Sequence, residues 1–328
     1  EPPTTLSEAG ESVGLTRERV RQLEKRLTDT IDDSTPWTPV LDKVLKVIAK
    51  MAPASADDAQ QLLSDKALVR GSFSIQSLLS AAQIFGRDVG FEYDREAGVI
   101  FRDGTGMSPR LVSTEARRLT THWGAATLDA LAAELAERGA SDVDAALSRV
   151  LLETVPNLQW LDDEKEWFWV KGTNRNRLLN QVEKIMSVAG SIEIGELREG
   201  VGRFHRMGGF RPPREVLARL CEQSGLYSRD GDLITEGPGL RAWDEVLGQT
   251  VEGRIAEALF EYGPVMRRDG LEHIVVAERG VNRSSFDVYL GYSPIIARYA
   301  PGVYGLRGAR VTAGEVNALI PPRVRQQR

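Results

Sequence analysis

The sequence contains few of the residues from which catalytic, metal and disulfide sites are built. Its 328 residues include one cysteine, Cys221, and three histidines that lie far apart, His122, His205 and His273. One cysteine excludes an intrachain disulfide framework and a cysteine-rich zinc site, and it fits a reducing compartment. No Walker loop, dinucleotide fingerprint, nucleophile elbow or His-Glu-x-x-His motif occurs. We therefore expect a protein that is not an enzyme, with no catalytic residues, no metal and no cofactor.

Long hydrophobic runs are also missing. No segment approaches the roughly 18 apolar residues of a membrane-spanning helix, and no signal peptide opens the chain. We expect no membrane association and a cytoplasmic, nucleoid-associated location. The first residues, Glu1-Pro2-Pro3, include no initiator methionine, which leaves open whether the chain is a fragment that lacks upstream domains.

The net charge of −5 is unusual for a nucleic-acid binder, but the charges are unevenly distributed. Residues 36–170 carry 20 acidic and 14 basic side chains, whereas residues 171–221 carry 5 acidic and 10 basic ones. Residues 291–328 carry six arginines and one acid. Segregated charge can form positive surfaces on an acidic protein, because the local field matters more than the total. The alternative is that these segments are ordinary solvated faces.

Residues 5–26, TLSEAGESVGLTRERVRQLEKR, predict a helix-turn-helix. Thr5 and Glu8 have the spacing of a capping box, and Gly14 suits the turn that ends the first helix. Thr16 is a good N-cap for the second helix, whose inner face we expect to be formed by Val20, Leu23 and Leu27. Two short helices joined by such a turn can place the second one in a DNA major groove.

The run from Gly14 to Glu24, GLTRERVRQLE, closely resembles the recognition helix of region 4 of primary sigma factors, which binds the −35 promoter element. The resemblance covers residues 5–30. It implies that double-stranded DNA is a partner and that RNA polymerase or an effector protein is a candidate partner. The DNA-facing residues implied on this helix are Thr16, Arg17, Glu18, Arg21, Gln22 and Lys25. Arginine matches guanine O6 and N7, and glutamate accepts from cytosine N4. The alternative is a helix-turn-helix retained for packing or partner binding.

The resemblance does not extend to a complete sigma factor. Nothing downstream resembles the aromatic region that melts the −10 element or the main polymerase-clamp-binding helix of that family. Two helices of this size also bury too little surface to fold alone, so we expect them to pack on upstream helices or on the following module.

The rest of the sequence predicts one order of elements four times: a helix, a short link of small residues, two more helices and a β-hairpin. The first copy has predicted helices at 40–51, 57–63 and 75–85, with strands at 89–93 and 98–102. The second has helices at 114–122, 128–137 and 142–154, with strands at 158–161 and 167–170. The third has helices at 177–188, 194–203 and 214–224, with strands at 226–228 and 233–235. The fourth has helices at 251–262, 268–278 and 284–290, with strands at 295–299 and 303–306.

This order is that of a winged helix-turn-helix, and a spacing of about 70 residues between hairpin turns indicates an array of units. Residues 250–308, with the run GVNRSSF from Gly280 to Phe286, resemble the winged-helix modules of the HARE-type family, and the resemblance weakens in the other copies. We expect a mainly α fold with small β-hairpins (α+β): a helix-turn-helix followed by about four winged-helix-like modules in tandem. The expected domains are residues 1–34, 36–105, 110–172, 174–238 and 245–310, with a basic tail at 311–328.

Two further segments are candidate DNA contacts. In the third module, a basic run ends in an Arg-rich loop before a helix, where charge and backbone N–H groups together suit a phosphate. Its candidate residues are Arg175, Arg177, Arg203, Arg206, Arg211 and Arg214. In the fourth module, Asn282, Arg283 and Ser284 begin the expected recognition helix. The alternatives are that the third module's basic surface holds the acidic second module or another protein, and that the fourth docks on protein.

Two features of the second module have tempting functional interpretations. Trp160, Trp167 and Trp169 could stack on bases, but two of them share one strand face, which favours hairpin core. The run Asp163-Glu164-Lys165 offers the acid-x-Lys element of nucleases, but it lies in a predicted hairpin turn with no accompanying acidic strand.

These observations together predict a non-catalytic DNA-binding protein of bacterial type that reads duplex DNA through the second helix at its start. It would act as a transcription regulator or as the DNA-recognition component of a larger system, such as a defence system. The competing hypothesis is a scaffold that docks on RNA polymerase or an effector enzyme without reading DNA.

Overall fold

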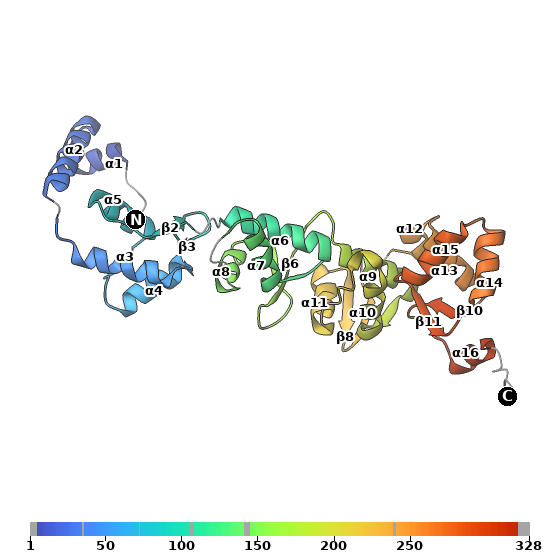
Figure 1. Ribbon diagram of the computed structural model, residues 1–328. Coiled ribbons are helices and arrows are strands. Elements are labelled where there is room, and N and C mark those ends of the chain that lie inside the picture. The colour runs from blue at the N-terminus through green and yellow to red at the C-terminus, as the bar shows by residue number, and fades with distance from the viewer. Residues whose placement is uncertain are drawn as a thin grey trace. The chain divides into compact units, whose positions relative to one another are not determined.

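The computed structural model describes residues 5–34, 36–71, 73–104, 108–140, 145–238 and 241–320. Figure 1 shows their helices and strands, and their contacts divide the chain into two compact units. One contains residues 1–115 and 128–156, and the other contains residues 116–127 and 157–328. The mainly helical content with small antiparallel sheets confirms an α+β fold.

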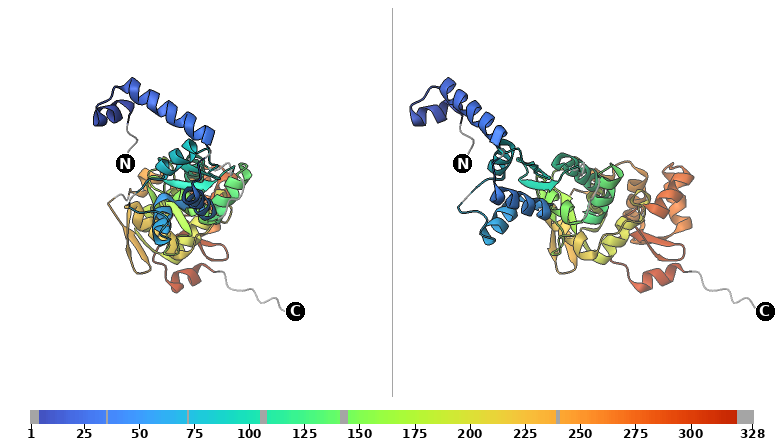
Figure 2. Two further views of the ribbon diagram at one scale, coloured as in Figure 1. Left: turned by 90° about the vertical axis from the view of Figure 1, so that its left-hand side faces the viewer. Right: turned by 60° about the vertical axis from the view of Figure 1, so that its left-hand side comes forward.

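The helix-turn-helix predicted at the start of the chain is confirmed. Helix α1 spans Leu6–Val13 and helix α2 spans Arg17–Ser34, which Figure 2 shows as a short helix followed by a much longer one. The second helix runs eight residues past the last residue of the predicted motif, Arg26. Its sequence from Leu27 to Ser34 contains no glycine or proline, so nothing local ends it earlier.

The remaining elements follow one order four times: helix, short strand, two helices and hairpin. The first repeat comprises α3 (Pro39–Met51), β1 (Ala54–Ser55), α4 (Ala56–Asp65), α5 (Ile75–Ile84), β2 (Phe91–Asp94) and β3 (Val99–Arg102). The second comprises α6 (Pro109–Trp123), β4 (Ala126–Thr127), α7 (Leu128–Glu137), α8 (Ala145–Leu152), β5 (Leu158–Trp160) and β6 (Trp167–Val170). The third comprises α9 (Arg177–Ala189), β7 (Ser191–Glu193), α10 (Ile194–Arg203), α11 (Arg214–Ser224), β8 (Tyr227–Asp230) and β9 (Leu233–Glu236). The fourth comprises α13 (Val251–Tyr262), β10 (Val265–Arg267), α14 (Arg268–Glu272), η2 (His273–Glu278), α15 (Arg283–Tyr292), β11 (Ile296–Ala300) and β12 (Val303–Leu306).

Each repeat builds the same three-stranded antiparallel sheet. The last strand of the hairpin lies in the middle, between its hairpin partner and the short strand that follows the first helix, as in the order β7-β9-β8. The four short strands are absent from the sequence-based prediction, which assigned them to links. They are two or three residues long, so they carry no alternation of polar and apolar residues that could reveal them.

Several smaller elements also differ from the prediction. Residues 268–278 form a short α-helix that continues as a π-helical turn, η2, instead of one regular helix. A helix α12 (Trp243–Leu247) precedes the fourth repeat, and a 3₁₀ turn, η1 (His205–Met207), follows α10. The expected basic tail contains a helix, α16 (Ala313–Leu319), which begins at a capping box of Thr312 and Glu315. Residues 321–328 of that tail lie outside the described residues.

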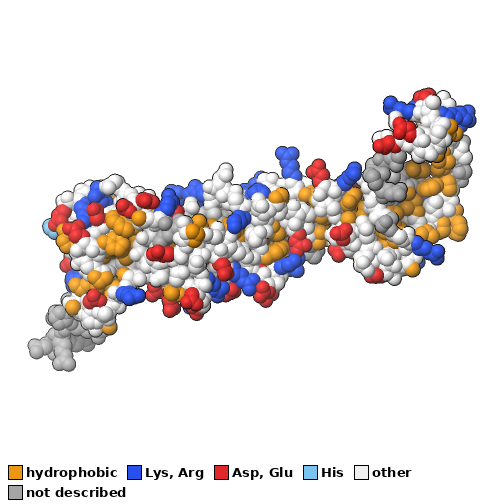
Figure 3. Space-filling view, turned by 180° about the vertical axis from the view of Figure 1, so that it is seen from behind, with side chains coloured by type: hydrophobic (Ala, Val, Ile, Leu, Met, Phe, Trp, Pro, Cys, Tyr) orange, Lys and Arg blue, Asp and Glu red, His pale blue; other side chains and the backbone are white. Residues whose placement is uncertain are grey.

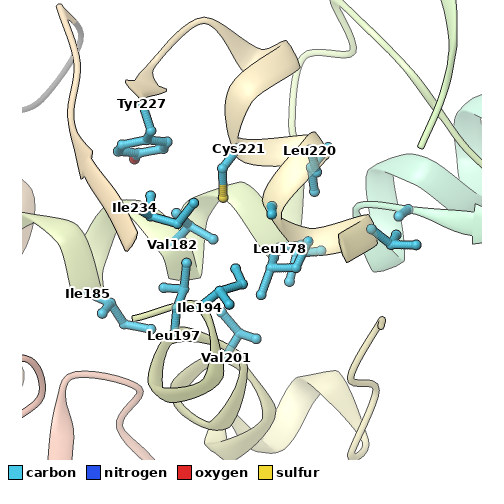
Figure 4. Close-up of a cluster of buried hydrophobic side chains, with 14 of the residues drawn as sticks. Leu178, Val182, Ile185, Ile194, Leu197, Val201, Leu220, Cys221, Tyr227 and Ile234 are labelled. Atoms are coloured by element: carbon cyan, nitrogen blue, oxygen red, sulfur yellow. The ribbon is translucent and has the colours of Figure 1, made fainter. Parts of the chain in front are cut away.

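The hydrophobic core of the third repeat is formed by all three of its helices and its sheet (Figure 4). Leu178, Val182 and Ile185 of α9 face Leu197 and Val201 of α10 and Ile234 of β9 in this core; each of the six side chains is 0% exposed. Cys221 of α11 lies among them, and burial raises the pKa of its thiol to about 12. The thiol is therefore protonated and unreactive at neutral pH.

The third and fourth repeats are joined by buried polar contacts. Glu252, which is 3% exposed, accepts hydrogen bonds from Lys184 Nζ and from Ser293 Oγ. The guanidinium of Arg307, 6% exposed, donates to the carbonyl oxygens of Glu196, Pro294 and Ile296. Because buried charges without partners are costly, these contacts fix how the two repeats meet within this unit. Over the described part of the chain, no helix is both long and apolar enough to cross a membrane.

Candidate nucleic-acid interface

The turn between α1 and α2 has the geometry that its sequence predicts. Thr5 Oγ1 accepts from the backbone N–H of Glu8, and the Glu8 carboxylate accepts from the N–H of Thr5, which completes the capping box. Gly14 ends α1 in the left-handed conformation, with φ of 68°. A Cβ on Gly10 would lie 2.5 Å from the carbonyl oxygen of Leu15, so only glycine lets the turn approach α1 this closely.

The predicted DNA-facing residues of α2 lie on an exposed surface. Thr16 caps the helix, because its Oγ1 accepts from the N–H of Arg19 at 3.3 Å. The residues that follow the cap are all exposed: Arg17, Glu18, Arg21, Gln22 and Lys25. Positions 18, 21, 22 and 25 are three or four residues apart and therefore share one helix face. The side chains of Arg17 and Lys25 make no hydrogen bond or ion pair with any residue that the structure describes.

Two of these residues are paired with each other in the free protein. The Arg21 guanidinium donates to both carboxylate oxygens of Glu18, from Nη2 at 2.7 Å and from Nε at 2.9 Å. The hydrogen bonds from Arg21 lower the pKa of the Glu18 carboxyl. Both side chains are more than half exposed, so the pair contributes little to stability. In the free protein the Arg21 guanidinium is thus paired with Glu18, whereas the Arg17 guanidinium has no partner among the described residues.

The opposite side of the helix pair is apolar and largely uncovered. Val13, Leu23 and Leu27 are 65%, 41% and 61% exposed, and Gly10 is the buried residue of α1. Leu23 and Leu27 were predicted to lie on the inner face of the second helix. Their exposure agrees with the argument that two helices of this size do not bury a core of their own.

Two arginines of the basic segment in the third repeat, Arg177 and Arg203, bind backbone carbonyl oxygens of other elements. Arg203 lies in α10, half-buried, and its Nη2 donates to the carbonyl oxygens of Leu290 and Gly291 near the end of α15. Arg177 donates through Nη1 to the carbonyl oxygen of Arg206 at 2.8 Å and lies 3.3 Å from His122 Nε2. Burial, followed by the positive charges of Arg177 and Arg118, lowers the pKa of His122. Arg177 and Arg203 therefore hold neighbouring elements together.

The loop before α11 is exposed, as predicted from its glycines and prolines. Arg175, Arg206, Arg211 and Arg214 all have exposed side chains. Arg198 holds the loop in place, because its Nε donates to the carbonyl oxygen of Pro212 at 2.6 Å. The structure thus separates the six predicted residues into four exposed arginines and two that bind backbone carbonyls.

Helix α11 is the third helix of the third repeat, and the face that carries Arg219 and Gln223 is covered by the β5–β6 hairpin, whereas Arg214, Glu215 and Glu222 remain exposed. Arg219 forms a two-point ion pair with Asp163, at 2.8 and 3.2 Å. Gln223 donates to the carbonyl oxygen of Trp160 and accepts from the indole of Trp169. Asp163 thus belongs to a hairpin turn, and Trp169, 4% exposed, belongs to the core, as the sequence predicts. The third repeat thus binds the β5–β6 hairpin through residues other than the predicted loop arginines.

In the fourth repeat, the predicted residues lie at the start of α15, where Asn282 caps the helix and Arg283 is paired with an acid. Asn282 Oδ1 caps the helix by accepting from the N–H groups of Ser284 and Ser285. Arg283 is paired with Glu272 at 3.0 Å, and Arg268 is paired with Asp287 at 2.6 Å. All three predicted residues are exposed, but the arginine at this helix start already has a carboxylate partner. On the face shown in Figure 3, Lys and Arg side chains are interspersed with Asp and Glu.

Sequence reasoning missed Arg298 and Arg307, which the structure brings close to Arg203. The only signal was the excess of arginine in residues 291–328. Among the described residues, no group of three or more His, Cys, Asp or Glu side chains is arranged to hold a metal ion.

The comparison with protein families agrees with the geometry of the first two helices. Residues 1–27 match the family described as Sigma-70, region 4. No curated protein matches the chain. The match covers a small part of the 328 residues and includes α1 and the first part of α2 with its exposed basic face. The chain therefore carries, at its start, a helix-turn-helix similar to the DNA-binding region 4 of sigma-70 factors.

Proposed function

We propose that this protein is a non-catalytic DNA-binding protein whose helix α2 reads duplex DNA in the major groove. The observation that carries the proposal is the exposed face formed by Arg17, Glu18, Arg21, Gln22 and Lys25 on a capped helix. Arginine can bind the guanine edge in a bidentate manner, and glutamate can accept from cytosine N4. The protein acts as a transcription regulator or as the DNA-recognition component of a larger system.

We also infer that the four repeats are winged-helix modules in tandem. Two observations support this inference: the constant order of three helices and a hairpin, and the short strand that pairs with the last hairpin strand in every repeat. In this proposal the repeats support the reading helix and extend the contact with DNA through the exposed arginines Arg175, Arg206, Arg211 and Arg214.

Selection of duplexes from a random library by the intact protein would test base reading. The selected duplex is then titrated with Arg17→Ala, Arg21→Ala and the control Lys46→Ala, which removes an exposed charge from α3. Each of the first two variants should lose about 1–3 kcal/mol of binding free energy on the selected duplex. The control should bind as the parent does. Equal affinity and selectivity of all four proteins would rule out the assigned role of α2.

A second candidate function is a scaffold that docks on RNA polymerase or an effector enzyme without reading DNA. It is favoured by the covered face of α11 and by the carboxylates that neutralise Arg268 and Arg283. The salt dependence of duplex binding separates the two functions, because each phosphate contact steepens the slope of log K against log salt by about 0.9. A scaffold that ignores DNA would show no duplex binding at about 50 mM salt.

A further inference from the structure

Four arginines converge on a cavity of about 480 Å³ between α10 and the β11–β12 hairpin. They are Arg203, Arg211, Arg298 and Arg307, and two acids, Glu196 and Glu199, complete the charged part of the lining. We refer to this cavity as the arginine pocket. It lies within one compact unit and does not involve the helix-turn-helix.

Three of the four arginines of this pocket have no acidic partner among the described residues. Within the described part of the chain, Arg203, Arg211 and Arg298 form no ion pair, and Arg307 lies 3.8 Å from a carboxylate oxygen of Glu199. By contrast, Arg267, Arg268 and Arg283 beside α14 are each paired with an acid. The six charged side chains leave an excess of positive charge that no residue of the pocket compensates.

The guanidinium groups of Arg203 and Arg307 are also not fully satisfied by hydrogen-bond acceptors of the described residues. The Nε of Arg203 is buried and has no partner among the described residues. Arg307 is 6% exposed, and its guanidinium uses three of five donors on carbonyl oxygens. Burial, and then the charge of Arg203, lowers the pKa of Arg307, as expected where like charges approach each other. Such an arrangement is stabilised when an anion occupies it.

Two glycines of α10 leave space for the side chains of Arg307 and Arg211. A Cβ on Gly200 would lie 2.7 Å from Cδ and Nε of Arg307, and a Cβ on Gly202 would lie 2.1 Å from Nε of Arg211. Glycine is disfavoured inside a helix, yet α10 has Gly200 in its second half and Gly202 one residue before its last. Both glycines thus leave room for an arginine side chain to cross the helix.

We propose that the arginine pocket binds a phosphate group. Planar guanidinium groups match phosphate oxygens through paired N–H donors, and several of them around one cavity suit a doubly charged phosphate monoester. The volume exceeds that of a single phosphate and falls in the range of small-ligand pockets, so it accommodates an attached organic group such as a nucleoside. The phosphodiester of a DNA backbone offers the same chemistry and is the second source that the experiment distinguishes.

The test is calorimetric titration of the full chain with inorganic phosphate, with adenosine monophosphate and with a duplex of arbitrary sequence. The variants are Arg211→Gln and Arg298→Gln, whose exposed side chains make no ion pair with a described residue. Arg241→Gln is the matched control, because it removes an exposed arginine of the same unit that is paired with Glu183. Gly202→Ala is a second probe, since its methyl group would displace Arg211.

We expect saturable binding of a small phosphate, weakened about fivefold or more by each pocket variant and less than about twofold by the control. If Arg298→Gln, which is not among the arginines assigned to DNA contact above, weakens duplex binding alone, the phosphate comes from DNA. If only small-phosphate binding is weakened, the ligand is a free phosphate compound. Affinities that are the same for pocket variants and control, or no binding of any of the three probes, would overturn the proposal. Arg17→Ala should alter duplex binding alone, so failure of the base-reading function is seen separately.

Discussion

The indole Nε1 of Trp169 donates a hydrogen bond of 2.9 Å to Oε1 of Gln223, which lies 54 residues later in the chain. The same Gln223 donates from Nε2 to the carbonyl oxygen of Trp160 at 2.9 Å. The Gln223 side-chain amide therefore hydrogen-bonds to one group on each strand of the β5–β6 hairpin and joins the hairpin to α11. Because the contact is partly buried, neither partner is readily hydrated if the amide is lost.

We predict that Gln223→Ala lowers the free energy of unfolding by about 1–3 kcal/mol, because it leaves an indole N–H and a carbonyl without partners. Urea denaturation followed by tryptophan fluorescence measures the change. Glu222→Ala, one position earlier and exposed, is the control and should have little effect. Equal stability of the two variants would mean that the hairpin does not depend on this amide.

The pair of Glu18 and Arg21 predicts a change in selectivity. Glu18→Gln removes a negative charge from the DNA-facing surface and releases Arg21, so binding to duplexes of arbitrary sequence should strengthen about two- to threefold at low salt. Binding to the selected duplex should instead weaken where Glu18 reads a cytosine, because the glutamine has a different donor pattern. Competition titrations measure the ratio of the two affinities. A ratio that stays at the parental value would show that Glu18 has no part in reading bases.

Two glycines of the helix pair should respond differently to alanine. Gly14→Ala places a Cβ in open space and incurs only the cost of the left-handed conformation, about 1 kcal/mol. Gly10→Ala places its Cβ 2.5 Å from the Leu15 carbonyl oxygen, so the turn itself must move. Hydrogen exchange over residues 6–34 should therefore increase more for Gly10→Ala, and DNA affinity should fall further. The reverse order would contradict the close approach of the turn to α1.

Glu215 predicts a pH dependence of stability. Hydrogen bonds from Arg229, and next from Arg219, lower the pKa of its carboxyl from 4.5 to about 2. A carboxyl with a lowered pKa in the folded state stabilises the fold above its unfolded-state pKa and loses that contribution as the pH falls. Relative to Glu215→Gln, the parent should be more stable above pH 4.5, and this advantage should disappear as the pH falls toward 2. Denaturation curves at several pH values measure the difference, which a pH-independent offset would contradict.

Much of the fold is predictable because its signals are local. The bounds of α7, α10, α11 and α13 agree with the prediction to the residue, since caps, prolines and apolar periodicity mark their ends. The hairpin at Gly231 was equally clear, although β8 extends to Asp230 and leaves a shorter loop than expected. The first strand of each sheet was not predictable, because it is defined by its distant partner and not by its own residues.

The candidate site was predictable only where the residues share one helix. The spacing of Glu18, Arg21 and their neighbours places them on one helix face, and the resemblance to region 4 implies that this face contacts DNA. The role of Arg203 depends on the end of α15, 87 residues away, and that of Arg219 on a hairpin 56 residues earlier. A count of basic residues identified the segment but could not separate the arginines that bind carbonyls from those that remain exposed. Which arginines bind carbonyl oxygens depends on contacts with residues that are distant in the sequence.

The covered face of α11 has a consequence for how the chain unfolds and for how it can be divided. Ala125, Leu161 and Trp169 of the second repeat belong to the same hydrophobic cluster as the helices of the third. Cutting the chain near residue 173, between two expected domains, would expose that cluster on both pieces. The β5–β6 hairpin and the third repeat should accordingly lose structure in a single cooperative step. Fragments designed for crystallography or partner screening should keep residues 109–238 intact.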